Sequence, residues 1–194
     1  MQVIGLTGSA GTGKSTIAEM VRSHYIPCWD ADAVVHQLMS VSEELIHDIA
    51  TLFPEVYQQG VIQRPLLRHI VFTHPPLLQK LEDLIYPHLY PIAQEFIAEQ
   101  KASHSLCFLD VPLLFEANWQ GLCTKVIVTV APLSVEMVRL QQRGLTEEEI
   151  AGILARQWST ERKAALADYS IDTGGSQQQT LQQLIVILGE ITSA

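Results

Sequence analysis

The stretch Gly8–Ser15 reads Gly-Ser-Ala-Gly-Thr-Gly-Lys-Ser, which is a phosphate-binding loop, or P-loop, of the form Gly-x-x-x-x-Gly-Lys-Ser. Glycines permit the backbone angles and the close approach that a loop needs when its N–H groups point inward at phosphate oxygens. The helix that follows such a loop directs its N-terminal N–H groups and the positive end of its dipole at the same anion. The motif therefore predicts a strand, a phosphate-binding loop and a helix, in that order.

The residues around the P-loop fit this order. Val3–Leu6 is short and apolar, as a buried parallel strand is, and the apolar residues from Ile17 to Val21 recur on one helical face. A chance match in a glycine-rich turn is the alternative, and these flanks argue against it. Lys14 is expected to reach the β- and γ-phosphates, and the Ser15 hydroxyl is expected to bind Mg²⁺. The residues expected to contact the nucleotide here are Gly8, Ser9, Ala10, Gly11, Thr12, Gly13, Lys14, Ser15 and Thr16.

Composition limits the class of protein. A chain of 194 residues with 47% hydrophobic residues is long enough for one domain with a sizeable core. The net charge of −9 argues against a nucleic-acid partner. The three cysteines form no C-x-x-C pair, which suits a reducing compartment. No signal peptide is recognisable and no apolar run approaches the ~20 residues of a membrane span, so we expect a cytoplasmic protein.

Two acidic residues follow the second predicted strand, which ends at Trp29. Asp30 is placed to cap the next helix, and Asp32 falls in the first turn of that helix. The carboxyl ends of the strands are the edge where ligands bind in open α/β sheets, so Asp32 is a candidate catalytic residue. The alternative is that its carboxylate only stabilises the helix through the dipole. His36 follows on the same face, where a surface histidine is the simpler interpretation.

The residues from 42 to 102 read as helical, with breaks at prolines and no recognisable strand. A parallel sheet needs a much shorter crossover, so this stretch predicts an inserted helical subdomain that covers the second substrate. Pro87 and Pro91 are expected to kink or divide its long helix. Arg64 and Arg68, four residues apart, are candidates for an anion contact or for plain surface charge.

The third predicted strand, Leu106–Asp110, has four apolar residues followed by an acid. This is the pattern of a Walker B strand, whose carboxylate approaches Mg²⁺ directly or through water. Beyond Pro112 the apolar run that contains Leu113 and Phe115 suggests a wall for an organic ligand, with ordinary core packing as the alternative.

Val126–Val130 is the clearest strand because its residues are β-branched. The helix after it carries Arg139 and Arg143 on one face, and a second helix, capped by Thr146, is expected to carry Arg156 and Gln157. An arginine-bearing helix pair at this place suits a mobile lid over phosphates, whereas charged helix surface is the alternative.

Alternating strands and helices predict an α/β fold with a parallel five-stranded sheet and flanking helices. We expect a single P-loop kinase domain. Its core spans about 1–40, 104–132 and 164–194, its helical substrate-binding insert about 42–102, and its lid about 133–163.

The order of these sites suits a small kinase. The P-loop would hold ATP, Mg²⁺ would bridge the β- and γ-oxygens, an acid would orient the attacking hydroxyl, and arginines would neutralise the developing charge. The expected catalytic residues are Lys14, Asp32, Arg139 and Arg143.

Several motifs resemble the dephospho-CoA kinase family across essentially the whole chain. They are Gly-Leu-Thr-Gly at 5–8 with the P-loop, Asp-Ala-Asp at 30–32 with His36, Gly60 to Arg64, Val-Pro-Leu-Leu-Phe-Glu at 111–116, Arg139 with Arg143, Arg156-Gln157, and 167–172. The resemblance implies a nucleoside-monophosphate-kinase-like P-loop NTPase core with a helical substrate domain and a lid. It also implies transfer of the ATP γ-phosphoryl group to the ribose 3′-hydroxyl of dephospho-CoA, with Asp32 activating the acceptor.

Site residues follow from this resemblance. ATP is expected to contact Arg139 and Asp172 besides the P-loop, and Mg²⁺ to be held by Ser15 and Asp110. The residues expected to bind dephospho-CoA are Asp32, Arg64, Leu113, Phe115 and Glu116. A monomer or weak homo-oligomer is expected.

The chain departs from the family pattern at Tyr86, Tyr90, Lys125 and Thr173, but keeps the P-loop and Asp32. A kinase for another small hydroxyl acceptor, such as a nucleoside or sugar acid, is the nearest alternative. A nucleotide-binding switch is a second, and its GTPase form is weakened because Asn118 is the only asparagine, which leaves no Asn-Lys-x-Asp element.

Overall fold

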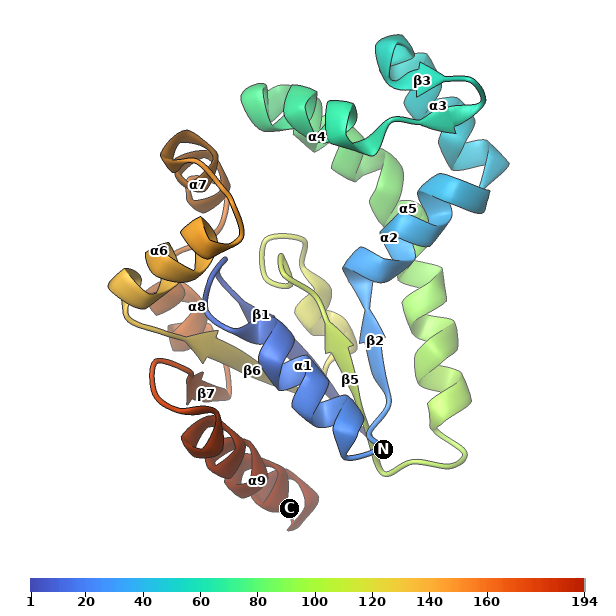
Figure 1. Cartoon of the computed structure of the whole chain (residues 1–194). Coiled ribbons are helices and arrows are strands. Elements are labelled where there is room, and N and C mark those ends of the chain that lie inside the picture. The colour runs from blue at the N-terminus through green and yellow to red at the C-terminus, as the bar shows by residue number, and fades with distance from the viewer. Residues whose placement is uncertain (194) are drawn as a thin grey trace. The chain divides into compact units, whose positions relative to one another are not determined.

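The computed structural model describes residues 1–193 (Figure 1). Contacts between residues divide the chain into two compact units. The first unit contains Met1–Trp29 together with Phe96–Ala194, and the second contains Asp30–Glu95. Each unit is described by itself.

The first unit is built on a five-stranded sheet with the order β2-β5-β1-β6-β7. Strand β1 lies at the centre and pairs in parallel with β5 on one side and β6 on the other, and β6 pairs in parallel with β7. The strands are β1 (Gln2–Gly8), β2 (Cys28–Asp30), β5 (Leu106–Asp110), β6 (Lys125–Val130) and β7 (Tyr169–Asp172). The parallel five-stranded sheet predicted from the sequence is confirmed.

Helices cover the sheet, and this cover explains the apolar strands. Every residue of β5 and all but the first of β1 are buried, as in parallel strands with both faces covered. Helices α1 (Lys14–Ser23) and α9 (Gln177–Ser193) pack with the strands into one core, whose fully buried members include Ile4, Ile17 and Phe108. Burying a side chain such as Ile17 contributes about 1.5–3 kcal/mol.

Three further helices follow β6 in the first unit: α6 (Leu133–Gln142), α7 (Glu147–Leu154) and α8 (Thr160–Leu166). Thr146 and Glu149 form the capping box that the sequence predicts at the start of α7. The expectation that this helix carries Arg156 and Gln157 is wrong, because α7 ends at Leu154. Both residues lie in the connection to α8. The hydroxyl of Ser159 caps α8 by accepting a hydrogen bond from Arg162 N.

The second unit is mostly helical and contains α2 (Ala31–Val41), α3 (Glu43–Leu52), the 3₁₀ turn η1 (Pro54–Val56) and α4 (Arg64–Thr73). Its core includes the fully buried Leu45 and Ile49 of α3. The unit begins at Asp30 and includes α2, which packs on α3.

The sequence predicts no strand in this insert, and that expectation is wrong. Strands β3 (Tyr57–Gln58) and β4 (Val61–Ile62) form a small antiparallel hairpin. Its turn residues Gln59 and Gly60 have φ of 52° and 83°, as a type I′ turn requires. Two-residue strands are too short to show an alternating pattern.

Helix α5 (Pro75–Gln100) is one helix of 26 residues, so Pro87 and Pro91 do not divide it. Each proline removes one backbone donor. The helix nevertheless continues through both positions, where its remaining hydrogen bonds hold it.

Candidate nucleotide-binding site

The P-loop joins β1 to α1 and owes its course to two glycines. Gly11 and Gly13 have φ of 86° and 81°, a left-handed conformation that other residues rarely adopt. A Cβ on Gly11 would lie 2.8 Å from the carbonyl oxygen of Glu136, and a Cβ on Gly13 would lie 2.9 Å from the hydroxyl of Thr173. The loop therefore needs glycine both for its conformation and for its close contacts.

Threonine hydroxyls hold the loop from inside the protein. The Thr12 hydroxyl lies 2.7 Å from the carbonyl of Ser9 and 2.7 Å from the hydroxyl of Thr129 at the end of β6. The Thr173 hydroxyl donates to the carbonyl of Thr12 at 2.7 Å. These bonds use carbonyl and hydroxyl groups and occupy none of the N–H groups of the loop. Some of those N–H groups have protein partners, since Thr12 N donates to the carbonyl of Ser9 at 3.2 Å and Ala10 N to Gln157 Oε1 at 2.7 Å.

The N-terminus of α1 is open to an anion. Gly13 precedes the helix, no side chain among residues 1–193 caps it, and its first turn contains no acidic residue. The unpaired N–H groups and the helix dipole therefore leave positive potential at this end of the helix.

Lys14 and Asp110 form an ion pair between the start of α1 and the end of β5. Asp110 is 4% exposed. The pairing of β1 with β5 places Leu6 opposite Asp110, so the sheet itself brings the predicted Walker B carboxylate to the P-loop lysine.

Arg139 binds the P-loop and the segment after β7. Its guanidinium donates to the carbonyl of Gly11 at 3.1 Å, and to the hydroxyl and the carbonyl of Thr173 at 2.9 and 2.6 Å. Arg143 follows the last turn of α6. Both arginines thus lie at the P-loop end of the first unit.

A cavity of about 330 Å³ opens beside this network. It is lined by Gly13 and Thr16 from the P-loop region, Arg139, Gln142 and Arg143 from α6 and its end, and Thr173, Gly175, Gln177 and Thr180 from the β7–α9 segment. A cavity that joins the phosphate loop to polar and cationic side chains suits a phosphorylated ligand.

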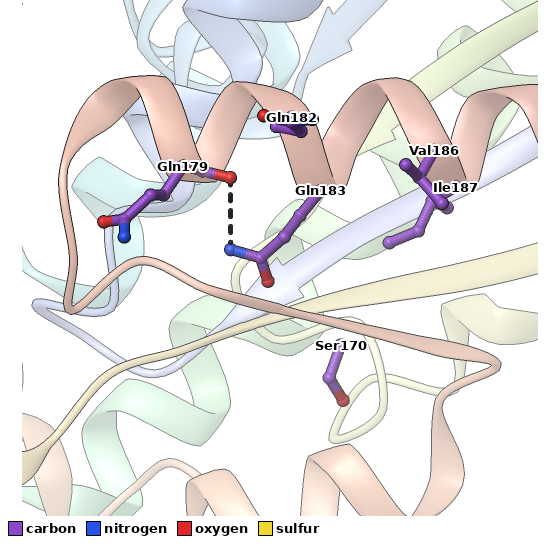
Figure 2. A pocket seen from close by; sticks show the side chains of 6 residues that line it. All are labelled: Ser170, Gln179, Gln182, Gln183, Val186 and Ile187. Carbon is purple, nitrogen blue, oxygen red and sulfur yellow. Dashed lines mark hydrogen bonds between the residues drawn. The ribbon is translucent and has the colours of Figure 1, made fainter.

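A second cavity, of about 480 Å³, lies along α9 and β7 (Figure 2). Gln179, Gln182, Gln183, Ser170, Val186 and Ile187 line it. None of these side chains is charged, so the first cavity is the better candidate for a phosphorylated ligand.

Comparisons with known proteins identify relatives over most of the chain. The family model described as dephospho-CoA kinase matches residues 2–179. A dephospho-CoA kinase of Mesorhizobium japonicum is 39% identical over 98% of this chain and 97% of its own length.

The chain belongs to the dephospho-CoA kinase family.

Solved structures support the family assignment. A Thermus thermophilus protein, TT1252, has a TM-score of 0.84 and is 32% identical, with 97% of each chain covered. Dephospho-CoA kinase from Campylobacter jejuni has a TM-score of 0.71 and is 26% identical, over 98% of this chain and 97% of that chain. The P-loop kinase fold that the sequence predicts is therefore confirmed.

In members of a kinase family the P-loop region should suit Mg²⁺, and its donors do. Asp110 offers a buried carboxylate and Ser15 an exposed hydroxyl, which are the hard oxygen ligands that Mg²⁺ prefers. Among residues 1–193 no group of three or more His, Cys, Asp or Glu side chains gathers in a way that could hold a metal. Ser15 and Asp110 are the side chains of this region that could hold a Mg²⁺ ion, with phosphate and water as its further ligands.

The segment after β5 carries three residues that the sequence predicts to bind the acceptor, and they are buried to different extents. Phe115 is 4% exposed, and its ring stacks on Trp158 with a centroid distance of 6.3 Å. Glu116 Oε1 accepts from Trp158 N at 2.8 Å and pairs with Lys163 Nζ at 2.9 Å. Leu113 is half-buried.

Asp32 and Arg64 belong to the second unit. Asp32 lies exposed in the first turn of α2, and the carboxylate of Asp30 caps that helix by accepting from Ala33 N at 3.0 Å. Arg64 is the exposed first residue of α4. The capping role predicted for Asp30 is confirmed.

Asp172 lies at the end of β7 and is exposed. Its carboxylate accepts from Gly174 N at 2.7 Å and so shapes the turn that leads to the cavity.

The sequence analysis gave no role to Lys163, which is fully buried. Burial lowers the pKa of Lys163, while the Glu116 carboxylate opposes this effect and the charge of Lys14 adds to it. Nothing in the sequence distinguishes Lys163 from the exposed Arg162 beside it, because the difference arises when α8 packs on β6.

Glu136 is another buried acidic residue near the P-loop, with 4% of its surface exposed. Burial is the main reason why the pKa of Glu136 is raised, and the hydroxyl of Thr160 partly offsets it. The backbone of Glu136 lies so close to Gly11 that α6 and the loop leave no room for a Cβ there.

No helix within residues 1–193 is both long and apolar enough to cross a membrane.

Proposed function

We propose that this protein transfers the γ-phosphoryl group of ATP to the ribose 3′-hydroxyl of dephospho-CoA, which yields CoA and ADP. The observation that carries the proposal is the Lys14–Asp110 pair at the end of a P-loop, in a chain of the dephospho-CoA kinase family. A P-loop, its lysine and a Walker B carboxylate are the common parts of ATP-dependent phosphoryl transfer.

In this proposal the first unit binds ATP. The N–H groups of Gly8–Thr16 bind the phosphates, Lys14 interacts with the transferred group, and the adenosine lies in the cavity beside Arg139 and Thr173. Arg139 and Arg143 supply positive charge, which stabilises the charge that develops on the phosphoryl oxygens. Asp172 shapes the turn at the nucleoside end.

Mg²⁺ would be held by Ser15 and Asp110. When bound, it would neutralise charge on the phosphate oxygens. Lys14 would then share the Asp110 carboxylate with the ion. The ion pair already holds these two side chains next to each other.

Acceptor binding involves Asp32, Arg64, Leu113, Phe115 and Glu116. Asp32 takes the proton from the 3′-hydroxyl as that oxygen attacks, and Arg64 binds an anionic group of the acceptor. Leu113 and Phe115 offer apolar surface. Glu116, already bonded to Lys163 and Trp158 N, fixes the segment that carries them.

The test is a coupled assay of ADP release with ATP, Mg²⁺ and a panel of acceptors. Dephospho-CoA should give the highest kcat/KM, and CoA, which lacks a free 3′-hydroxyl, should give none. A nucleoside or sugar acid that outperforms dephospho-CoA would replace the proposed acceptor while leaving the kinase assignment intact. Lack of acceptor-dependent ADP release would contradict the kinase assignment.

The proposal includes a cytoplasmic location, where both substrates occur, and a monomer or weak homo-oligomer that needs no nucleic acid or membrane. Sedimentation of the purified protein tests the oligomeric state. A stable larger assembly would contradict it.

A further inference from the structure

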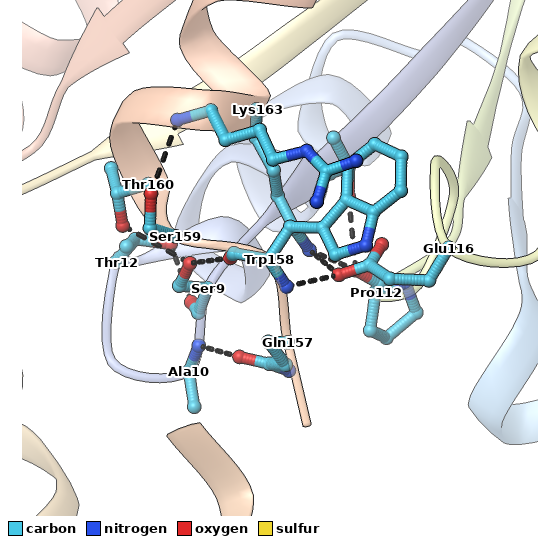
Figure 3. A network of polar contacts seen from close by, with 12 residues as sticks. Ser9, Ala10, Thr12, Pro112, Glu116, Gln157, Trp158, Ser159, Thr160 and Lys163 are labelled. Carbon is cyan, nitrogen blue, oxygen red and sulfur yellow. Dashed lines mark hydrogen bonds and ion pairs between the residues drawn. The ribbon is translucent and has the colours of Figure 1, made fainter. Parts of the chain in front are cut away.

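The connection between α7 and α8, residues 155–159, lies directly against the P-loop (Figure 3). Gln157 Oε1 accepts a hydrogen bond from Ala10 N at 2.7 Å. The hydroxyl of Ser9 donates to the carbonyl of Trp158 at 3.4 Å and accepts from the hydroxyl of Thr160 at 3.0 Å. Two consecutive P-loop residues are therefore bonded to this connection.

The backbone beside Gln157 is fixed on its other side. Trp158 N donates to Glu116 Oε1 at 2.8 Å, and the buried Lys163 pairs with the same oxygen at 2.9 Å and donates to the carbonyl of Pro112 at 2.9 Å. Arg162 lies over the Trp158 ring at 3.4 Å from its centroid. These contacts hold the main chain in place, so Gln157 can change its contact at the P-loop by side-chain rotation alone.

Gln157 uses only its acceptor at the P-loop. The N–H groups of a P-loop serve to bind phosphate oxygens, and a neutral amide oxygen here takes the place of such an oxygen at Ala10. Among the described residues, no hydrogen bond engages Gln157 Nε2. A glutamine carries two donors beside its acceptor, and rotation of the terminal amide exchanges their places.

We infer that Gln157 is a phosphate-contacting residue of this kinase that exchanges its acceptor for its donor when ATP binds. Without nucleotide, Oε1 satisfies Ala10 N. With nucleotide, a phosphate oxygen takes the N–H of Ala10, and the rotated amide donates Nε2 to that phosphate. The inference rests on the proposed function in one respect, because the phosphate is that of ATP.

A purely structural link between the connection and the P-loop is the alternative, and the substitutions Gln157→Glu and Gln157→Met together separate the two. A negative charge beside Ala10 N repels phosphate in either case, whereas Gln157→Met adds no charge and weakens ATP binding only if Nε2 contacts the phosphate. Glutamate has the same shape and accepts from Ala10 N at least as well, so a structural link would survive. It has no donor and carries a negative charge, so it would repel phosphate. Gln157→Met, of similar length, removes both donor and acceptor.

The experiment measures ATP affinity by titration calorimetry and the melting temperature without nucleotide, on the full chain. We expect Gln157→Glu to keep the wild-type melting temperature and to lose about tenfold or more in ATP affinity, and Gln157→Met to lose about threefold. Gln182→Glu adds the same charge on the exposed face of α9 and should stay within about twofold of wild type.

Each other outcome overturns the inference. ATP affinity of Gln157→Glu equal to that of Gln182→Glu would leave only a structural link. ATP binding by Gln157→Met that equals wild type would show that Gln157 makes no phosphate contact, and tighter binding would show that Gln157 merely competes with phosphate. Wild-type protein that binds no ATP would overturn the proposed function as well, which distinguishes that failure from the others.

Discussion

Two charged side chains, Lys14 and Arg139, help to hold the phosphate-binding loop of this protein in place. Lys14 is paired with the buried Asp110, and Arg139 donates to the carbonyl of Gly11. A buried charge is costly unless it is paired, so each of these residues is fixed by its partner. Their positions are thus set before a nucleotide arrives, which is the condition for electrostatic stabilisation of a transition state.

Replacing Lys14 tests the P-loop chemistry. We expect Lys14→Ala to lose about 3 kcal/mol or more of transition-state stabilisation, because the variant lacks the positive charge that Lys14 places next to the transferred phosphoryl group. The measurement is kcat at saturating ATP. Since Lys14→Ala also removes the ammonium partner of Asp110, the double variant Lys14→Ala/Asp110→Asn should recover stability without recovering activity. Near-normal turnover of Lys14→Ala would contradict the assignment.

Asp32 tests the acceptor chemistry. Asp32→Asn keeps the shape of the side chain and removes its charge, so turnover with dephospho-CoA should fall by about 10²–10⁴-fold while ATP affinity stays near that of wild type. If the carboxylate only stabilises α2 through the helix dipole, the variant will instead have a lower melting temperature and nearly intact turnover. Measuring all three quantities on one preparation decides between the two roles.

At the scale of elements, the molecule joins segments that are distant in sequence at the carboxyl ends of its central strands. The loop after β1, the segment after β5 and the connection before α8 meet through Ser9, Glu116 and Lys163. Parallel strands all present their carboxyl ends at one edge, so the topology brings these segments together.

The Lys163–Glu116 pair should stabilise this junction. Lys163→Met leaves Glu116 with no ammonium partner in a largely buried position, and we expect the free energy of unfolding to fall by about 3–5 kcal/mol. Chemical denaturation measures the change. Lys163→Met/Glu116→Leu, which replaces the pair by apolar groups, should recover much of it. A single variant as stable as wild type would show that the pair contributes little.

The strand pair β6–β7 should make stability depend on pH. Burial opposes ionisation of Asp168, but Lys125 Nζ and Val126 N, each at 2.8 Å, outweigh it and lower the pKa of Asp168. A lowered carboxyl pKa stabilises the fold above the unfolded-state value of about 3.9, and this contribution is lost as pH falls through the folded-state value.

We therefore expect Asp168→Asn to be less stable than wild type at pH 7, with the difference shrinking below about pH 4. Denaturant unfolding at several pH values measures it. A difference that is constant with pH would mean that the charge of Asp168 is not what matters, and Lys125→Met should reproduce part of the effect.

At the scale of the whole molecule, the chain forms two compact units that carry different parts of the proposed reaction. The P-loop, Asp110 and the arginines belong to the first unit, and Asp32 and Arg64 belong to the second. ATP should therefore stabilise the first unit, whereas the acceptor, which is also proposed to contact Leu113, Phe115 and Glu116 of the first unit, should stabilise both.

Amide hydrogen exchange tests this division. ATP alone should slow exchange in the P-loop, α1 and the β7–α9 segment, because binding to the native state lowers the population of open forms. Exchange in the β3–β4 hairpin of the second unit should change little. Equal protection of both regions by ATP alone would contradict the division of roles.

Much of the first unit could be predicted from the sequence. The P-loop, the five strands, the Asp30 cap and the Thr146 capping box depend on local preferences and periodicity, which neighbouring residues encode. The β3–β4 hairpin and the end of α7 could not be predicted, because short strands and helix ends give weak local signals.

By itself the sequence determined the family, the P-loop and the alternation of strands and helices, since these depend on residue type and spacing along the chain. Only the tertiary structure decided that Lys163 is buried while Arg162 is exposed, that Arg139 bonds to Gly11 and Thr173, and that Gln157 meets Ala10. The physical reason is that burial and pairing are properties of side chains brought together from distant segments, and no local pattern specifies which segments meet.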